Sequence, residues 1–416
     1  MNAAAMDAAD ELAGFRDRFF IPPHNGGEGI YLCGNSLGLQ PRTAADAIAQ
    51  ELEDWRDLAV EGHFRGRRPW KDYHERFAGP LAALTGAGEH EVVCMNGLTV
   101  NLHLLMVSFY RPVGRRRKIL IERPAFPSDR YAVVSQILFH GLDPADALVE
   151  VAPRPGEQAL RDDDFVEAID AHGDELACVL LPGVQYLSGQ VLDMEGLTAL
   201  ARNRGATVGL DLAHAIGNVP LSLHDWGPDF AVWCSYKYLN GGPGAVGGAF
   251  VHERHARDFG GPRFAGWWGH DKASRFLMGP DFRAMPGAEG WQLSNPPVLG
   301  MAALLASLEI FMEAGMDRLR RKSLALTGYL AERIGGRFAD DVRIITPAEP
   351  ARRGCQLSLE LKDGAERGRR VFRRLGEAGI VCDWREPDVI RVAPVPLYNT
   401  FADVDRFADA LAGALR

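Results

Sequence analysis

Residues 207–251 of the chain read TVGLDLAHAIGNVPLSLHDWGPDFAVWCSYKYLNGGPGAVGGAFV. Two apolar runs within this stretch, 207–212 and 230–234, have the length and composition of short buried strands. Asp211 lies near the carboxyl end of the first run, and Lys237 follows the second run almost directly. The stretch therefore places the carboxylate of Asp211 and the amine of Lys237 where buried strands are expected to end.

Outside this stretch, further apolar runs at 117–122 and 176–181 alternate with helical patterns. That alternation predicts the α/β class, with a large domain built on a mostly parallel central sheet flanked by helices. After Pro297 the pattern changes to one long helix through Arg321, followed by alternating segments. The change predicts a smaller α+β domain.

Composition excludes several classes of function. The formal charge of −9 is spread along the chain and the basic runs are short, so no nucleic-acid partner is predicted. Two uncharged stretches, 92–110 and 290–308, contain polar residues or prolines that make a membrane span unconvincing. The amino terminus does not resemble a signal peptide. The six cysteines are far apart without CxxC spacing, which predicts thiols and a cytoplasmic location.

Asp211 and Lys237 each have an ordinary structural explanation, as a cap or ion pair and as a surface amine. Together they match what pyridoxal phosphate requires, namely a partner for the pyridinium nitrogen and a lysine that forms a Schiff base. His252 and His255 lack a further ligand nearby in the sequence, so no metal is predicted.

A wider resemblance extends over nearly the whole chain. It is carried by GNSLGLQP (34–41), NGLTVNLHLLM (96–106), AFPSDR (125–130), DLAHAIGNVPL (211–221), SYKYLNGGPG (235–244), GWWGH (266–270), SNPP (294–297) and RVAPVPLYNTF (391–401). In these segments the chain resembles the kynureninases, within the fold-type I pyridoxal-phosphate enzymes. The resemblance implies hydrolysis of L-kynurenine or 3-hydroxy-L-kynurenine to an anthranilate and L-alanine, a step of tryptophan catabolism and NAD precursor synthesis.

The resemblance also implies roles for particular residues. Lys237 and Asp211 are the expected catalytic residues, carrying the cofactor and pairing with its ring nitrogen. The expected cofactor contacts are Leu98, Thr99, Phe126, Pro127, Ser128, Asp129, Asp211, His214, Tyr236, Lys237, Trp267 and Asn295. The expected substrate contacts are Ser36, His63, Asn295 and Arg391.

In this set Trp267 is expected to reach the phosphate from a neighbouring subunit, which implies a homodimer with shared active sites. Arg391 is expected to bind the substrate carboxylate, although an internal ion pair with Asp383 or Glu386 is the alternative explanation. Pro182 stands where some members of the family place a Ser or Thr near the cofactor. The resemblance further implies an N-terminal segment (1–60) packed on the small domain (301–416), with a large cofactor-binding domain (61–300) between them.

Other functions remain as alternatives. Gly34 to Gly38 fit the G-x-S-x-G elbow of serine hydrolases, although only one short strand can precede Ser36. Cys355 invites comparison with the cysteine desulfurases of the same superfamily, and an aminotransferase or a ligand-binding protein without catalysis is also open. Gly242, Gly244 and Gly247 fit a dinucleotide fingerprint, but Pro243 within it favours a loop.

Overall fold

The computed structural model describes residues 2–256 and 259–416. Its centre is a seven-stranded sheet in the order β4-β10-β9-β8-β7-β5-β6. The five strands from β9 to β6 are parallel to one another, whereas β10 is antiparallel to both of its neighbours. Their bounds are β4 Val92–Cys94, β5 Lys118–Glu122, β6 Leu148–Val151, β7 Leu176–Pro182, β8 Thr207–Asp211, β9 Phe230–Trp233 and β10 Gly248–Val251. The predicted α/β class with a mostly parallel central sheet is confirmed.

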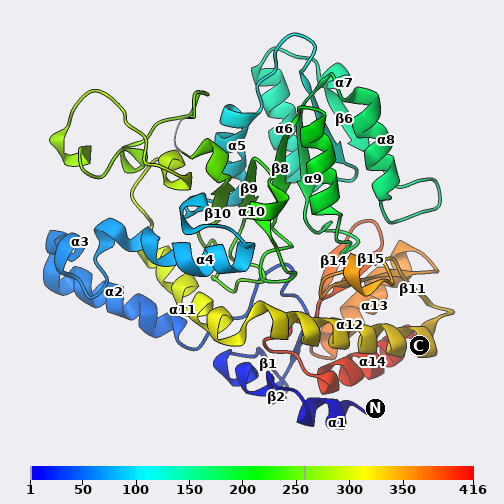
Figure 1. Cartoon of the computed structure of the whole chain (residues 1–416). Coiled ribbons are helices and arrows are strands. Elements are labelled where there is room, and N and C mark those ends of the chain that lie inside the picture. Colours follow the sequence, from blue (N-terminus) through cyan, green and yellow to red (C-terminus); the bar gives the residue numbers. More distant parts are fainter. Residues whose placement is uncertain (1, 257–258) are drawn as a thin grey trace.

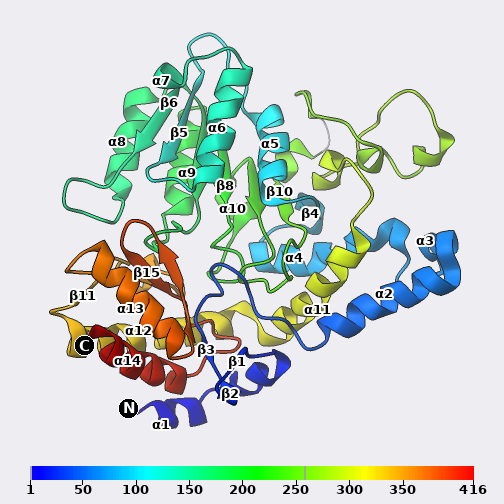
Figure 2. The same cartoon turned by 180° about the vertical axis from the view of Figure 1, so that it is seen from behind.

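The central strands are apolar because helices cover both faces of the sheet. All seven residues of β7 are buried. In Figures 1 and 2, α5 and α6 lie on one face and α9 lies on the other. The helices of this domain are α4 Ala78–Thr85, α5 Leu98–Phe109, α6 Pro127–Phe139, α7 Pro144–Ala147, α8 Asp162–His172, α9 Met194–Asn203 and α10 Leu223–Trp226.

The prediction of one continuous helix from Pro297 through Arg321 is wrong. Two helices occupy this region, α11 Val298–Ala314 and α12 Met316–Phe338, and they meet at an angle of 82°. Gly315 lies between them with a φ of 74°, a left-handed conformation that glycine adopts without steric cost. Among the described residues no single helix is both long and apolar enough to cross a membrane; only this bent pair passes that test, by length and composition alone.

The C-terminal part of the chain forms a second, four-stranded antiparallel sheet in the order β11-β12-β15-β14. Helices α12, α13 and α14 pack around this sheet (Figure 2). A capping box at Thr400 and Asp403 fixes the start of α14. The bounds are β11 Val342–Ile344, β12 Leu357–Leu361, α13 Ala365–Glu377, β13 Ile380–Val381, β14 Asp383–Arg385, β15 Val389–Val392 and α14 Phe401–Leu415.

The first sixty residues contact two different parts of the molecule. α1 (Ala3–Ala8) packs on α14, and β3 (Ile30–Tyr31) pairs with β13. By contrast, α2 (Ala44–Leu58) packs on α11 and leads into α3 (Gly62–Arg65). A short hairpin of β1 (Pro23–His24) and β2 (Gly27–Glu28) precedes β3. The exact division into residues 1–60, 61–300 and 301–416 stays a prediction.

Candidate active site

A pocket opens where the parallel strands of the central sheet end. β5, β7 and β8 end at Glu122, Pro182 and Asp211, and Lys237 follows β9 after a bend. Parallel strands finish at one edge of a sheet, so these four side chains reach the same place. The pocket is lined by Leu98, Thr99, Glu122, Phe126, Ser128, Asp129, Pro182, Val184, Tyr186, Asp211, Ala213, His214, Cys234, Tyr236 and Lys237.

This lining contains most of the cofactor contacts expected from the sequence. The exceptions are Pro127, Trp267 and Asn295, and none of the expected substrate contacts lies in the lining. Pro127 is the first residue of α6 and so adjoins the pocket between Phe126 and Ser128. One chain therefore brings together most of the residues expected around the cofactor, but not those expected around the substrate.

Lys237 is a buried amine whose charge no carboxylate balances directly. Its side chain is 8% exposed, and its Nζ lies 5.7 Å from the centre of the Phe126 ring and 5.9 Å from that of Tyr236. Within the described part of the chain no carboxylate oxygen lies within ion-pair distance of this nitrogen. A lysine held between aromatic rings and free of a salt bridge is available as a nucleophile.

Three buried carboxyl groups, those of Glu122, Asp129 and Asp211, line the pocket beside this amine. Asp211 ends β8 and accepts a hydrogen bond of 2.6 Å from the backbone N–H of Ala213. Burial and the neighbouring Asp211 raise the pKa of Asp129 well above its ordinary value. Asp129 therefore holds its proton more readily than an exposed carboxyl group does.

Glu122 belongs to this cluster but was not singled out from the sequence. Burial, followed by the charges of Asp211 and Glu150, raises the pKa of Glu122 to about 8. The signal was present, because Glu122 ends the apolar run KILIE just as Asp211 ends TVGLD. The position of an ionisable residue at the end of a buried strand identified Asp211, but the same pattern was overlooked at Glu122.

The opposite end of the pocket is built from two helix starts. α5 begins at Leu98 and α6 at Pro127, and neither start has a side-chain cap. The Thr99 and Ser128 hydroxyls lie 2.7 Å apart and join the first turns of the two helices. Unsatisfied backbone N–H groups and the positive ends of two helix dipoles favour an anionic group such as a phosphate at this point.

His214 adds an unsatisfied polar group to the pocket. Burial, followed by the charge of Lys237, lowers the pKa of His214 well below its usual value, so the imidazole is neutral. Its Nδ1 has no hydrogen-bond partner within the described residues, and the same holds for Oδ1 of Asp129. Buried polar atoms normally have a partner, so both atoms indicate a place for a polar ligand.

Tyr186 forms one wall of the pocket, and the segment around it is held by the small domain. The ring of Tyr186 meets that of Phe126 edge to face, with centres 5.4 Å apart. The backbone oxygen of Tyr186 accepts hydrogen bonds from Nη1 of Arg391 (2.7 Å) and Nε2 of Gln356 (3.2 Å). The Ser358 hydroxyl donates to the oxygen of residue 187, and the Thr346 hydroxyl to that of residue 188.

Arg391 lies behind this wall and is fully buried. Its Nη2 and Nε donate to the two carboxylate oxygens of Asp383, at 2.8 and 3.2 Å. The ion pair named as the alternative explanation for Arg391 is therefore present, with Asp383 and not with Glu386. The guanidinium has five N–H bonds and its three bonds to protein leave two of them free.

The remaining expected residues lie elsewhere on the chain. Trp267 is 44% exposed and its indole N–H donates to the backbone oxygen of Arg275 at 3.1 Å. His63 and Asn295 share a separate hollow between α3 and the start of α11. Ser36 lies in the turn of residues 34–38, next to the pocket-lining Tyr236, whose backbone oxygen accepts a hydrogen bond from the N–H of Gly38.

The alternative functions lack their required geometry. No helix follows Ser36 directly, because the next one begins at Ala44, so the strand–turn–helix elbow of a serine hydrolase is absent from this described segment. Cys355 is buried, and burial raises the pKa of its thiol to about 12, opposite to what a catalytic thiol requires. Gly242 and Gly244 have φ values of 91° and 69°, which confirms the predicted loop.

Comparison with known proteins agrees with this geometry. The family model of the kynureninase C-terminal domain matches residues 319–411. A kynureninase of Myxococcus xanthus is 58% identical over 415 residues, covering 100% of this chain and 97% of its own. A kynureninase of Stenotrophomonas maltophilia is 57% identical over 408 residues, covering 98% and 96% respectively.

Solved structures show the same fold at low identity. The cysteine desulfurase CsdA of Escherichia coli superposes with a TM-score of 0.79 and 18% identity, over 97% of this chain and 98% of its own. A cysteine desulfurase of Thermococcus onnurineus has a TM-score of 0.76 and 17% identity, over 93% and 94% respectively. These likenesses concern the fold alone. The relatives described above share more than half of the sequence along its whole length, and they show that this chain is a member of the kynureninases.

Proposed function

We propose that the chain hydrolyses the Cβ–Cγ bond of L-kynurenine or 3-hydroxy-L-kynurenine, releasing L-alanine and an anthranilate, with pyridoxal phosphate in the pocket described above. The observation that carries the proposal is the meeting of Lys237 and Asp211 in one buried pocket with two open helix starts. The relatives that match the chain over its full length bear the name of this activity.

The residues of the pocket fit the cofactor in three ways. The starts of α5 and α6 suit its phosphate, and the Phe126 ring, 40% exposed, offers a face for its ring. The unpartnered atoms of Asp129 and His214 can accept or donate hydrogen bonds at its polar edge. When bound, pyridoxal phosphate supplies an aldehyde for the substrate amine and a ring that accepts electrons.

The chain's own groups then have defined tasks. Asp211, at the end of β8, would hold a proton on the ring nitrogen of the cofactor through a charged hydrogen bond. Lys237 would hold the cofactor through its amine, and as a free amine in the same pocket it could take the α-proton of the substrate as a general base. Neutral His214 and the rings of Phe126 and Tyr186 line the same pocket.

The substrate's two ends need different partners. Its carboxylate suits the two free N–H bonds of Arg391, because the pair with Asp383 does not occupy them. The Ser36 hydroxyl, in the turn against Tyr236, offers a further hydrogen bond at the mouth of the pocket. Its aromatic ring needs an apolar wall with a few polar groups, and the hollow that contains His63 and Asn295 has Trp55 and Trp70 beside them.

We propose a homodimer, because that hollow and Trp267 are separate from the Lys237 pocket within one chain. Apolar side chains are exposed on α2, on α3 and on the segment that reaches away from the sheet in Figure 1. They are Leu52, Trp55, Val60, Phe64, Phe264, Trp267, Phe276, Leu277, Met278 and Phe282. This number of exposed apolar side chains favours a second copy of the chain as a cover for them. The proposal also places the enzyme in the cytoplasm, where its six buried thiols stay reduced.

Two measurements test the reaction and its lysine. Cofactor-loaded protein should convert kynurenine to a product with anthranilate fluorescence, and Lys237→Ala should abolish the signal. Borohydride reduction and peptide mapping should place the pyridoxyl group on Lys237. Release of sulfide from cysteine without anthranilate would favour a desulfurase, and an adduct on another lysine would refute the assignment of Lys237.

Mixing inactive chains tests whether subunits share sites. Lys237→Ala lacks the reactive amine, whereas Trp267→Ala lacks the donor expected from the neighbouring chain. If each site uses both chains, exchange between the two variants should restore activity to some of the mixed dimers. Activity no higher than that of either parent, with subunit exchange verified by mass spectrometry, would show that Trp267 acts within its own chain.

A further inference from the structure

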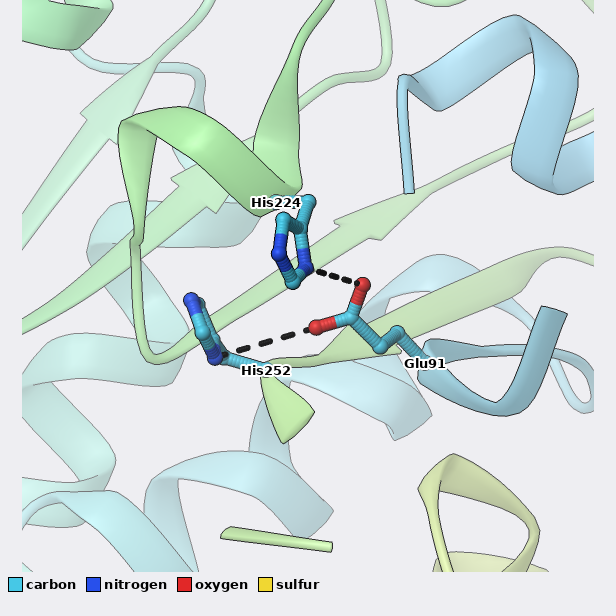
Figure 3. Close-up of side chains that lie close together, drawn as sticks. All are labelled: Glu91, His224 and His252. Atoms are coloured by element: carbon cyan, nitrogen blue, oxygen red, sulfur yellow. Dashed lines mark hydrogen bonds and ion pairs between the residues drawn. The ribbon is translucent and has the colours of Figure 1, made fainter. Parts of the chain in front are cut away.

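A second cluster of chemically active side chains lies away from the catalytic pocket. The Glu91 carboxylate faces both His224 and His252, as Figure 3 shows. Its Oε2 lies 3.0 Å from Nδ1 of His224, and its Oε1 lies 3.7 Å from Nδ1 of His252. The three potential ligand atoms all lie within 4.8 Å of one another.

Glu91 is a fully buried carboxylate that lacks a permanent cation. The backbone N–H groups of Gly88 and Glu253 donate to it at 2.8 and 2.7 Å, which keeps it oriented and ionised. Within the described residues its ion-pair partners are the two histidines alone. The nearby guanidinium of Arg254 is engaged by Asp229, at 2.8 Å. Apart from its two backbone donors, this buried anion meets only imidazoles, side chains that can bind a cation together with it.

The cluster joins three elements at the edge of the sheet opposite the active site. Glu91 precedes β4, His252 follows β10, and His224 lies on α10. β10 is antiparallel to β9, so its last residue, Val251, pairs with Phe230 at the amino end of β9. The catalytic residues lie beyond the carboxyl ends of the parallel strands, so the two sites share no side chain.

We propose that Glu91, His224 and His252 form a binding site for a divalent cation of the zinc type, which cross-links the start of β4, the end of β10 and α10. Two imidazole nitrogens and one carboxylate, completed by water, are an established ligand set for zinc in an open tetrahedral site. His224 is 42% exposed in its side chain, which gives the ion and its water access from solvent.

The spacing is close to what such an ion requires. Ligands about 2.0–2.1 Å from a tetrahedral zinc lie about 3.3 Å from one another. Oε2 of Glu91 lies 3.0 Å from His224 and Oε1 lies 3.7 Å from His252, so each histidine meets its own carboxylate oxygen at a separation close to this value. The two imidazole rings stack with centres 5.4 Å apart, and the backbone N–H groups hold the carboxylate in place. Binding through Nδ1 of His252 would replace the hydrogen bond that this atom accepts from the backbone N–H of Arg254 at 3.2 Å.

The test uses untagged holoenzyme freed of metal by a chelator and then freed of excess cofactor. Zinc titration by calorimetry should give one site per chain, and cobalt should give the visible absorption of a tetrahedral complex. His224→Ala and His252→Ala should each weaken binding at least tenfold. His90→Ala is the matched control, because His90 is exposed and pairs with Glu253 at 3.5 Å beside the cluster.

Thermal stability gives a second measure of metal binding, which does not depend on the absorption spectrum of the cobalt complex. At a zinc concentration one hundred times the Kd, the Tm of the native chain should rise by at least about 2 °C, and the rise should fall to about half or less in His224→Ala. Turnover of kynurenine should change less than twofold in this variant. The proposal is overturned if the native chain binds no stoichiometric metal, if His224→Ala and His252→Ala bind as the native chain does, or if His90→Ala loses binding equally.

Discussion

Replacing Glu122 with glutamine removes one ionisable group from the carboxyl cluster while keeping its size. In the folded chain burial raises the pKa of Glu122 from 4.5 to about 8. The folded protein therefore keeps this proton at pH values where the unfolded chain has already released it. Between those two values the folded state binds more protons, so rising pH lowers the free energy of unfolding.

The size of the effect follows from the two values. At about 1.4 kcal/mol for each tenfold change in proton affinity, ionised Glu122 costs the folded state on the order of 5 kcal/mol above pH 8. At pH 6 the same calculation gives about 2 kcal/mol. The Gln variant lacks this pH-dependent cost. Its free energy of unfolding, relative to that of the native chain, should therefore increase by about 2–3 kcal/mol between pH 6 and pH 8.5.

Thermal unfolding of the cofactor-free protein at several pH values measures this difference. For a chain of this length, a change of about 2–3 kcal/mol corresponds to about 2–3 °C in Tm. The difference in Tm between Glu122→Gln and the native chain should widen by that amount from pH 6 to pH 8.5. Glu61→Gln, which changes an exposed glutamate, is the control and should run parallel to the native chain. Parallel curves for Glu122→Gln would refute the raised pKa.

Three further predictions concern the reaction. Asp211→Asn should fold but lose turnover by orders of magnitude, because an amide cannot keep the ring nitrogen protonated; near-normal kcat would contradict this. Arg391→Ala should lower the free energy of unfolding, but by less than the about 3–5 kcal/mol of a fully broken buried pair, because Arg385 still pairs with Asp383 at 3.1 Å. Adding Asp383→Ala should restore the Tm but not KM; recovery of both would make Arg391 purely structural. Replacing His63 or Asn295 should change the kynurenine to 3-hydroxykynurenine rate ratio by up to about tenfold, since one hydrogen bond contributes about 0.5–1.5 kcal/mol. An unchanged ratio in both would refute that role.

The sequence predicted features that depend on local pattern. The buried strands were recognisable because they are short apolar runs, and the ionisable residues at their ends placed Asp211 and Lys237 in one pocket. The bend between α11 and α12 was missed, although Gly315 gave a local signal for it, because residues that favour a helix lie on both sides of that glycine.

Features that depend on contacts between distant segments could not be predicted in this way. Glu91, His224 and His252 lie far apart in the sequence and meet only because β4 and β10 are neighbours in the sheet. The pairing of Arg391 with Asp383 was foreseen only as an alternative, because charge pattern alone does not decide between a ligand and an internal partner.

The attachment of residues 185–190 to the small domain makes that domain a structural part of the cofactor pocket. Backbone oxygens of this wall are held by side chains of Gln356, Ser358 and Thr346, and Tyr186 on its inner side contacts Phe126. Gln356 and Ser358, which lie outside the pocket, are thus connected through Tyr186 to Phe126, the residue proposed to face the cofactor ring. Differences among homologous enzymes at Gln356 or Ser358 would tune how firmly the cofactor is clamped, with no change in any residue that touches it.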